Sequence, residues 1–238
     1  LTLTTCLDKA RTKEVLSYYK IPTSKFLLVN SINELKNFNL EFPVIIKPLA
    51  EGSSKGIFNS SFINNINDLE NNLSQLINDY KQPFLVEEFL PGREFTVALI
   101  GNDDELEVLP IIELNLNELP KELAPIYSYE AKWVVDTKEN PLNIFSCPAN
   151  ISNNLEIQIK DIAKETFKVL RCKDWCRIDI RLDENDLPNV IEVNPLPGIL
   201  PDPDDNSCFP KAARTAGMNY EEMINRVLFT AAKRYNLI

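Results

Sequence analysis

The sequence predicts an α+β fold built from two lobes. Helical and strand-like patterns alternate through the first 90 residues, and antiparallel hairpin patterns take over from Pro91. No internal repeat or low-complexity segment interrupts this order. Mixed elements followed by consecutive antiparallel strands are typical of an α+β chain. We place the boundary near residues 86–91, which gives a first lobe of residues 1–88 and a second lobe of residues 89–238.

The first lobe is expected to contain three strands and three helices. Residues 8–20 read as a helix with Asp8 near its start, and a short helix follows Ser31. Residues 66–80 place apolar side chains on one helical face. The strands are predicted at residues 25–30, 42–48 and 83–90.

The second lobe is expected to be mainly antiparallel. Its predicted strands are residues 93–102, 106–114, 175–183 and 189–194, and its predicted helices are residues 155–170 and 220–237. Residues 116–150 are rich in Pro and Asn, which indicates a long ordered loop or flap rather than core.

Charge and residue usage exclude several function classes. The net charge of −10 argues against a nucleic-acid or anionic-membrane partner. No apolar run reaches the roughly 18 residues that span a bilayer. The first residues lack the apolar core of a signal peptide, so we expect a cytoplasmic protein. The chain has no histidine, which excludes Ser-His and Cys-His nucleophiles.

The five cysteines show no framework spacing. Cys172 and Cys176 lie four residues apart, but neither a second cysteine pair nor a histidine completes a zinc site. Free thiols in a reducing compartment are therefore expected.

The stretch "KPLAEGSSKG", residues 47–56, has two interpretations. Backbone N–H groups freed by glycine, with hydroxyls and ammonium groups nearby, suit a phosphate-binding loop. The stretch matches neither G-x-x-x-x-G-K-[ST] nor G-x-G-x-x-G, so a polar surface turn is the alternative.

The strands "CRIDIRLD" and "VIEVN" carry a second chemical signal. Side chains alternate between the faces of a strand, so Ile178, Ile180 and Leu182 point one way and Arg177, Asp179 and Arg181 the other. On the return strand we expect Ile191 and Val193 to face the core, which leaves Glu192 and Asn194 on the opposite face.

Convergence of these polar side chains would form a hard-oxygen site. Asp179, Glu192 and Asn194 supply two carboxylates and an amide oxygen, which suit Mg²⁺ that also holds nucleotide phosphates. A solvated sheet face of mixed charge is the alternative. The sequence "PLPG" after Asn194 ends the strand sharply where a ligand would sit and favours the metal site.

These residues, in this order, resemble the ATP-grasp superfamily, and most closely the D-alanine–D-alanine ligase family. The resemblance is carried by "LDKARTK", "FPVIIKPLAEGSSKGI", "LVEEFLPGREFTVALIGN", "YSYEAKW", "CPAN", "WCRIDIRLD", "IEVNPLPG" and "FPKAARTAGMNYEEMI". It covers essentially the whole chain and implies an ATP-grasp fold with nucleotide bound between the lobes. The implied activity is an ATP- and Mg²⁺-dependent carboxylate–amine ligase that forms a peptide bond through an acyl phosphate in cell-wall precursor synthesis.

The resemblance also implies roles for individual residues. Lys9 and Lys47 look like the lysines that approach the nucleotide phosphates, and Lys132 like the lysine that closes over the γ-phosphate. Residues 51–54 resemble the loop that covers the phosphates in the family: Glu51, Gly52, Ser53 and Ser54. The resemblance also implies that Ser53 lies close to the reacting groups. Glu87 and Leu90 resemble the family's adenine contacts, and Glu94 resembles its ribose ligand.

The resemblance further implies metal ligands and groups that stabilise the intermediate. The implied ligands of two Mg²⁺ ions, with Mn²⁺ as an alternative, are Asp179, Glu192 and Asn194. Arg177 and the Gly198 N–H resemble the groups that stabilise the tetrahedral intermediate.

Three departures from the family pattern leave alternatives open. The family's full-length enzymes begin with a further N-terminal domain, and this sequence starts inside what resembles the central domain. Trp133 stands where the ligases usually have Tyr, so its indole offers only a donor toward the substrate. The turn after "PLPG" is longer and carries three aspartates next to Ser207, which resembles the serine that contacts the second substrate. We expect these aspartates to disfavour a free carboxylate, unless the turn faces solvent.

Three hypotheses follow. The first is a ligase that joins small-molecule amino acids. The second is an ATP-binding module that is inactive without the N-terminal domain. The third is an ATP-grasp ligase for other amino-acid substrates, indicated by Trp133 and the acidic turn. A homodimer rests on analogy alone.

Overall fold

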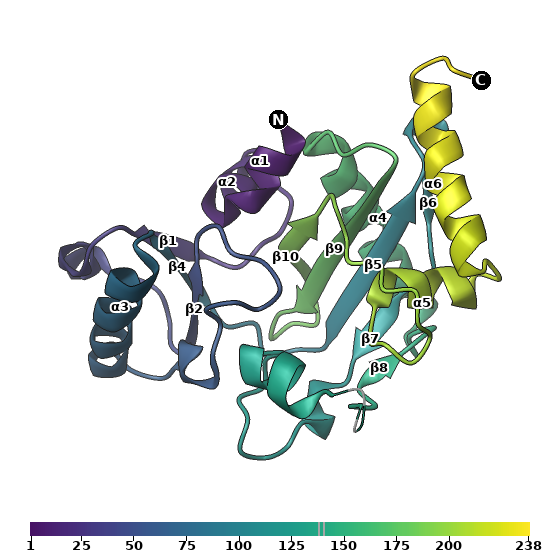
Figure 1. The fold of residues 1–238 in the computed structure, drawn as a ribbon. Coiled ribbons are helices and arrows are strands. Elements are labelled where there is room, and N and C mark those ends of the chain that lie inside the picture. The colour runs from purple at the N-terminus through teal and green to yellow at the C-terminus, as the bar shows by residue number, and fades with distance from the viewer. Residues whose placement is uncertain (138, 140) are drawn as a thin grey trace.

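The computed structural model describes residues 1–137, 139 and 141–238. Two antiparallel sheets form the framework of these residues (Figure 1). The smaller sheet has the strand order β1 (Phe26–Val29), β4 (Phe84–Glu88), β2 (Val44–Pro48) and β3 (Phe62–Ile63). Helix α3 (Ile66–Tyr80) buries Leu69, Leu73 and Leu76 in the same core as these strands. The predicted amphipathic helix is therefore confirmed, and its apolar face covers the small sheet.

The larger sheet has six strands. Its order is β10 (Pro188–Asn194), β9 (Trp175–Leu182), β5 (Glu94–Ile100), β7 (Ile112–Leu114) and β8 (Phe145–Ser146), with β6 (Glu107–Val108) also paired to β5. Helix α4 (Asn153–Val169) covers one face, and α5 (Cys208–Thr215) and α6 (Tyr220–Arg234) cover the other.

Strand β5 shows why the large sheet is covered on both sides. Its side chains alternate between the two cores: Val97 packs with the α4 side, and Ala98 and Ile100 pack with the α5 side. Both sets are almost fully buried, because residues 97–100 of this central strand are all apolar and need a layer on each face.

The first two helices lie on the large sheet although they precede the small one in sequence. Helix α1 (Thr2–Leu7), which the sequence reasoning missed, and α2 (Lys9–Tyr18) bury Cys6 and Leu16 in the α4-side core. Asp8 caps α2, as predicted, because its side chain accepts a hydrogen bond from the Arg11 N–H at 2.9 Å. Figure 1 shows both helices beside β10. The lobe boundary at residues 88 and 89 remains a prediction, and the large sheet's core includes side chains from before it.

The segment of residues 116–150 is only partly a loop. It contains the 3₁₀ turn η4 (Leu116–Glu118), the single-turn π-helix η5 (Ala131–Val135) and strand β8. Ala131, Ile144 and Phe145 are buried in the core on the α5 side. The expectation that this segment stays outside the core is therefore wrong. Ile144 and Phe145 are buried at the edge of the sheet, and strand β8 has only two residues, which is too short to show a hydrophobic period.

The remaining short elements are the 3₁₀ turns η1 (Ile32–Asn37), η2 (Asn59–Ser61) and η3 (Asp103–Glu105). The five cysteines are free thiols. Among the helices of the described residues, none is both long and apolar enough to cross a membrane.

Candidate active site

A cleft of about 550 Å³ lies between the small sheet and the large sheet. Its lining combines residues from β2 and β4 with residues from β5, β9 and β10. The sequence-predicted site residues that line it are Lys47, Gly52, Ser53, Ser54, Glu87, Leu90, Glu94, Lys132, Trp133, Arg177, Asp179, Glu192, Asn194, Gly198 and Ser207. The predicted residues Lys9 and Glu51 are not part of this lining; the Lys9 ammonium instead donates a hydrogen bond to the Glu51 backbone oxygen.

Strands β9 and β10 bring the predicted metal ligands together. Asp179 pairs with Glu192, and Arg177 pairs with Asn194, in the antiparallel register. A β-bulge between Val190 and Glu192 shifts that register.

The bulge corrects one prediction. Ile191 was expected in the core, but it is half-buried and lines the cleft, while Val190 is buried in the core instead. The extra residue of a bulge breaks strict alternation, and a one-residue irregularity of this kind leaves no mark in the apolar pattern. Glu192 still faces the cleft, so the acidic pair survives the shift.

Asp179 is the most heavily bonded carboxylate of the cleft. It accepts hydrogen bonds from Thr96 Oγ1 at 2.7 Å, from Arg177 Nη2 at 2.8 Å and from Asn194 Nδ2 at 3.2 Å. Burial alone would lower the pKa of Arg177, but the Asp179 carboxylate raises it above the usual range. The guanidinium is therefore a fixed positive charge on the floor of the cleft.

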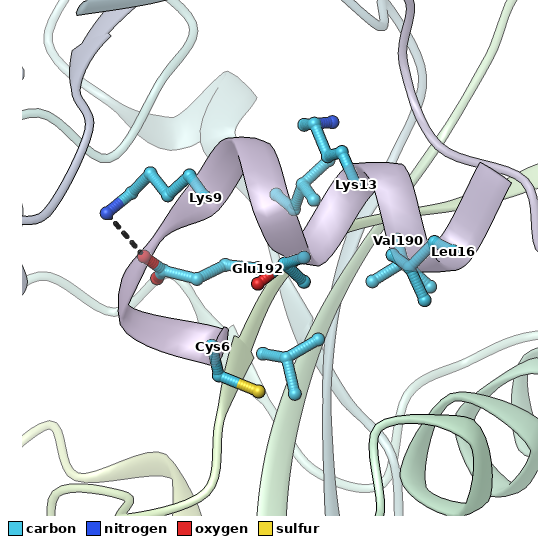
Figure 2. A pocket seen from close by; sticks show the side chains of 9 residues that line it. Cys6, Lys9, Lys13, Leu16, Val190 and Glu192 are labelled. Carbon is cyan, nitrogen blue, oxygen red and sulfur yellow. Dashed lines mark ion pairs between the residues drawn. The ribbon is translucent and has the colours of Figure 1, made fainter. Parts of the chain in front are cut away.

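Glu192 faces cations instead. Its Oε1 atom lies 3.5 Å from Lys9 Nζ, as Figure 2 shows from the side of α2. Burial would raise the pKa of Glu192, but Lys9, Arg177 and Lys47 outweigh it and hold the pKa below its usual value. Lys9 also donates to the Glu51 backbone oxygen at 2.5 Å, so it connects the start of the glycine-containing loop to the acidic pair.

A buried chain of charges joins α2, which packs on the large sheet, to strands β2 and β4 of the small sheet. Lys13 Nζ lies 2.9 Å from Glu87 Oε1, and Lys47 Nζ lies 2.5 Å from Glu87 Oε2. Burial would raise the pKa of Glu87, but the two ammonium groups lower it to about 2. Lys13 also donates to Thr23 Oγ1 at 2.6 Å and Ser24 Oγ at 2.9 Å.

Sequence reasoning missed Lys13. The signal was present, because Lys13 lies one helical turn after Lys9 and both side chains therefore share a face of α2. In the structure, Lys13 is only 2% exposed and reaches from a helix on the large sheet to a strand of the small one.

Two segments meet over the mouth of the cleft. We call residues 51–56 the phosphate loop and residues 127–136 the flap. Ser53 and Ser54 both have left-handed backbones, with φ of 56° and 59°, a conformation that non-glycine residues adopt at a cost. Trp133 Nε1 donates to the Ser53 backbone oxygen at 3.0 Å, and Ser54 Oγ donates to the Tyr127 backbone oxygen at 3.0 Å.

The flap carries Lys132 into the cleft. Burial, followed by the charge of Arg177, lowers the pKa of the Lys132 ammonium. The same ammonium lies 5.6 Å from the centre of the Trp133 ring. An ammonium that is partly desolvated and close to another cation is well suited to an incoming anion, which would relieve both penalties.

The opposite wall is a turn that we call the acceptor turn, residues 198–208. Ser207 Oγ accepts from the Leu200 N–H at 3.1 Å and donates to the Gly198 oxygen at 3.3 Å. The aspartates at positions 202, 204 and 205 are not among the cleft-lining residues, whereas Asn206, Ser207 and Cys208 are. The wall that a ligand meets is therefore neutral, and the acidic part of the turn lies away from it.

The residues that could hold a metal are the acidic pair and Asn194. In the described part of the chain, no group of three His, Cys, Asp or Glu side chains is arranged to bind an ion. Two adjacent carboxylates with an amide fit Mg²⁺, which usually takes few protein ligands and completes its shell with substrate phosphates and water.

Comparisons with known proteins agree with this arrangement. A family described as "D-ala D-ala ligase C-terminus" matches residues 15–229. The chain is 35% identical over 228 residues to an uncharacterized protein of Sinorhizobium fredii, y4sG, covering 96% of this chain and 63% of that protein. It is 34% identical over 251 residues to the D-alanine–D-alanine ligase of Clostridium acetobutylicum, covering 99% of this chain and 66% of the ligase.

A solved structure shows the same fold. The D-alanine–D-alanine ligase of Bacillus anthracis complexed with ATP superimposes with a TM-score of 0.70 at 20% identity, over 98% of this chain and 68% of that one. The chain thus spans about two thirds of the length of the proteins it resembles. The expected ATP-grasp, α+β fold is confirmed.

Proposed function

Because the chain belongs to the family of D-alanine–D-alanine ligase C-terminal domains, we propose that it is the nucleotide-binding and catalytic part of an ATP-dependent carboxylate–amine ligase. The observation that supports this most directly is the cleft itself. It places a row of cations beside a pair of carboxylates, between two lobes and under a flap. The substrates would be small amino acids, D-alanine first among them, in cell-wall precursor synthesis.

ATP would lie between the sheets. Glu87 and Leu90 line the end of the cleft next to β4, where they would contact adenine, and Glu94 at the start of β5 would contact ribose. Lys9, Lys47 and the phosphate loop, Glu51 to Ser54, would surround the phosphates. The neighbour from Bacillus anthracis was solved with ATP, which supports this choice of nucleotide.

Mg²⁺ would be held by Asp179, Glu192 and Asn194. These groups converge on one face of β9 and β10, and Glu192 keeps about a third of its side-chain surface exposed toward the cleft. Bound Mg²⁺ would neutralise phosphate charge and hold the triphosphate in line. Two ions, and Mn²⁺ in their place, are part of the proposal.

The chain's own residues would supply the remaining charge stabilisation. Phosphoryl transfer to a carboxylate requires positioning and neutralisation of spreading negative charge rather than a covalent enzyme group. Lys132 would contact the γ-phosphate from the flap. The substrate amine would then attack the acyl phosphate, with Arg177, the Gly198 N–H and Ser53 near the developing oxyanion and Ser207 and Trp133 near the second substrate.

A substrate panel on the full-length protein tests the proposal. Phosphate release is measured with ATP, Mg²⁺ and each of a set of D- and L-amino acids, alone and in pairs. We expect release that needs both ATP and an amino acid, and near-complete loss in Asp179→Asn and Glu192→Gln. Full activity in either variant would overturn the metal assignment. Turnover only with amino acids other than D-alanine would favour the different-substrate ligase that Trp133 indicates.

A second experiment, on residues 1–238 alone, distinguishes an active ligase from a module that binds ATP but is inactive without the N-terminal domain. If residues 1–238 alone bind ATP but do not turn over, ATP should raise their melting temperature by several degrees when present at about one hundred times Kd. Lys47→Met should remove that shift. Turnover by these residues alone would show that the cleft needs no further domain.

A further inference from the structure

The carboxylate of Asp136 ties three separate segments together behind the cleft. Its Oδ1 atom accepts hydrogen bonds from the Leu142 N–H at 2.8 Å and from Asn206 Nδ2 at 2.7 Å. Its Oδ2 atom accepts from Tyr127 Oη at 2.5 Å and again from Asn206 Nδ2 at 2.9 Å. Hydrogen bonds to an ionised acceptor are shorter and stronger than neutral ones, so four of them hold the carboxylate in one place.

The tie closes the π-helical turn that carries Lys132. The Asp136 N–H donates to the Ala131 oxygen at 2.8 Å, so the backbone of Asp136 ends that turn while its side chain holds both ends of the flap. Burial and the Asp136 carboxylate raise the pKa of the Tyr127 phenol, which therefore keeps the proton that it donates.

These bonds extend across the mouth of the cleft. On the small-lobe side, Ser54 Oγ donates to the backbone oxygen of Tyr127. On the large-lobe side, Asn206 also donates to the Leu142 oxygen at 3.3 Å and directly precedes Ser207 in the acceptor turn. Ser54, Tyr127, Asn206 and Ser207 line the cleft, and Asp136 lies behind them.

We propose that Asp136 is a positioning residue that fixes the flap to the acceptor turn, so that Lys132 and Ser207 keep one spacing across the cleft. The kinetic part of this inference rests on the proposed ligase function, and the hydrogen-bond part does not. Displacement of a reacting group by about 1 Å can lower a rate about one-hundredfold, so a loose flap should cost turnover more than nucleotide binding.

Single substitutions on the full-length protein give the first test. Asp136→Asn and Asn206→Asp should each lower kcat by about ten- to one-hundredfold, the range that such a displacement allows, while KM for ATP changes less than about threefold. Asp204→Asn is the matched control, since it makes the same change at an exposed position of the same turn. It should leave kcat within about twofold, as expected for a surface site.

The exchanged pair gives the decisive test. Asp136→Asn combined with Asn206→Asp restores one donor and one acceptor with the positions reversed, and the amide oxygen that Asp136→Asn introduces can still accept from Tyr127. We expect the double variant to recover at least about tenfold of the lost kcat. A double variant no better than the single ones would overturn the proposal.

Hydrogen exchange supplies a readout that does not depend on turnover. Asp136→Ala should speed amide hydrogen exchange in both residues 127–136 and residues 198–208. In the double variant Asp136→Asn with Asn206→Asp, the amides of both segments should be protected again. Faster exchange confined to the flap would contradict the tie to the acceptor turn. If the coupled change occurs in a protein without ligase activity, the proposed function fails while the tie stands.

Discussion

Glu87 is a buried carboxylate of the cleft that is paired with a cation on each side. Its carboxylate is 3% exposed and lies between two ammonium groups, one from a helix on the large sheet and one from a strand of the small sheet. An ion pair with excellent geometry on both sides is costly to break, because removal of one partner leaves buried charge uncompensated.

This predicts a pH-dependent contribution to stability. Because the folded-state pKa of Glu87 lies at about 2, below its ordinary 4.5, the contribution is complete above pH 4.5 and is lost as pH falls toward 2. A shift of this size corresponds to about 3 kcal/mol. In urea titrations, Glu87→Gln should be destabilised at pH 7, and the gap to wild type should narrow as the pH is lowered.

Glu88→Gln serves as the control for that measurement. Glu88 pairs with Lys25 at 3.3 Å, but the Lys25 side chain is 70% exposed, so this pair should contribute under about 1 kcal/mol. Curves for Glu87→Gln and wild type that stay parallel from pH 7 to pH 3 would contradict the assignment.

Trp133 provides an optical test of the flap. Its indole is 54% exposed and donates to the phosphate loop, so a ligand under that loop should change its environment. Trp175, the second tryptophan, packs edge-on against Phe209 at 5.4 Å in the core of the large lobe. We expect ATP to change the tryptophan emission of wild type and of Trp175→Phe, and to have no effect on the emission of Trp133→Phe. If ATP changes the emission of Trp133→Phe as much as that of wild type, the flap does not sense the nucleotide.

At the scale of elements, the segment that connects β4 to β5 approaches the backbone of β9 closely at Gly92. A Cβ atom there would lie 2.6 Å from Leu182 Cβ and 2.7 Å from the Leu182 oxygen. Leu182 is 1% exposed in the core and accepts the Gly92 N–H at 3.0 Å, so it has no room to move.

Gly92→Ala should therefore destabilise the protein by about 1–3 kcal/mol, the usual cost of overpacking. Gly52→Ala is the comparison, because nothing lies within 4 Å of a Cβ at that position. It should change the free energy of unfolding by about 0.5 kcal/mol or less. Equal effects of the two substitutions in urea denaturation would refute the close-approach argument.

Elements with a clear period were predictable, and short or irregular ones were not. Helix α3, helix α4, strand β9 and the cap at Asp8 follow directly from spacing and capping chemistry. Helices α1 and α5 were missed because six and eight residues give too few turns to show a period. The bulge at Ile191 and the buried strand β8 depend on contacts with distant segments, which local sequence does not encode.

At the scale of the whole molecule, the sequence predicted which residues meet but not how they are held. Motifs separated by more than 100 residues, such as those at Lys47 and Asp179, line one cleft, as expected. The supporting contacts were not foreseen: Lys13 behind Glu87, and Asp136 behind the flap. Lys13 ends the motif "LDKARTK" and Asp136 follows "YSYEAKW" by three residues, but each also contacts a segment far away in the sequence, Glu87 and Asn206 respectively.

The arrangement of the two lobes is consistent with chemistry at their junction. The phosphate loop belongs to the small lobe, the acidic pair to the large lobe, and the flap contacts both. A nucleotide held between them would bring the γ-phosphate under Lys132 and beside the acidic pair, with the acceptor turn opposite.

The central claim is that the cleft activates a carboxylate by phosphoryl transfer. The most direct measurement uses the full-length protein, ATP, Mg²⁺ and D-alanine labelled with ¹⁸O in its carboxylate. A carboxylate oxygen attacks the γ-phosphorus, and the later attack of the amine on the carbonyl expels phosphate that keeps this oxygen. Mass spectrometry of the released phosphate should therefore find one ¹⁸O atom in each molecule. Phosphate released without the label would contradict the account.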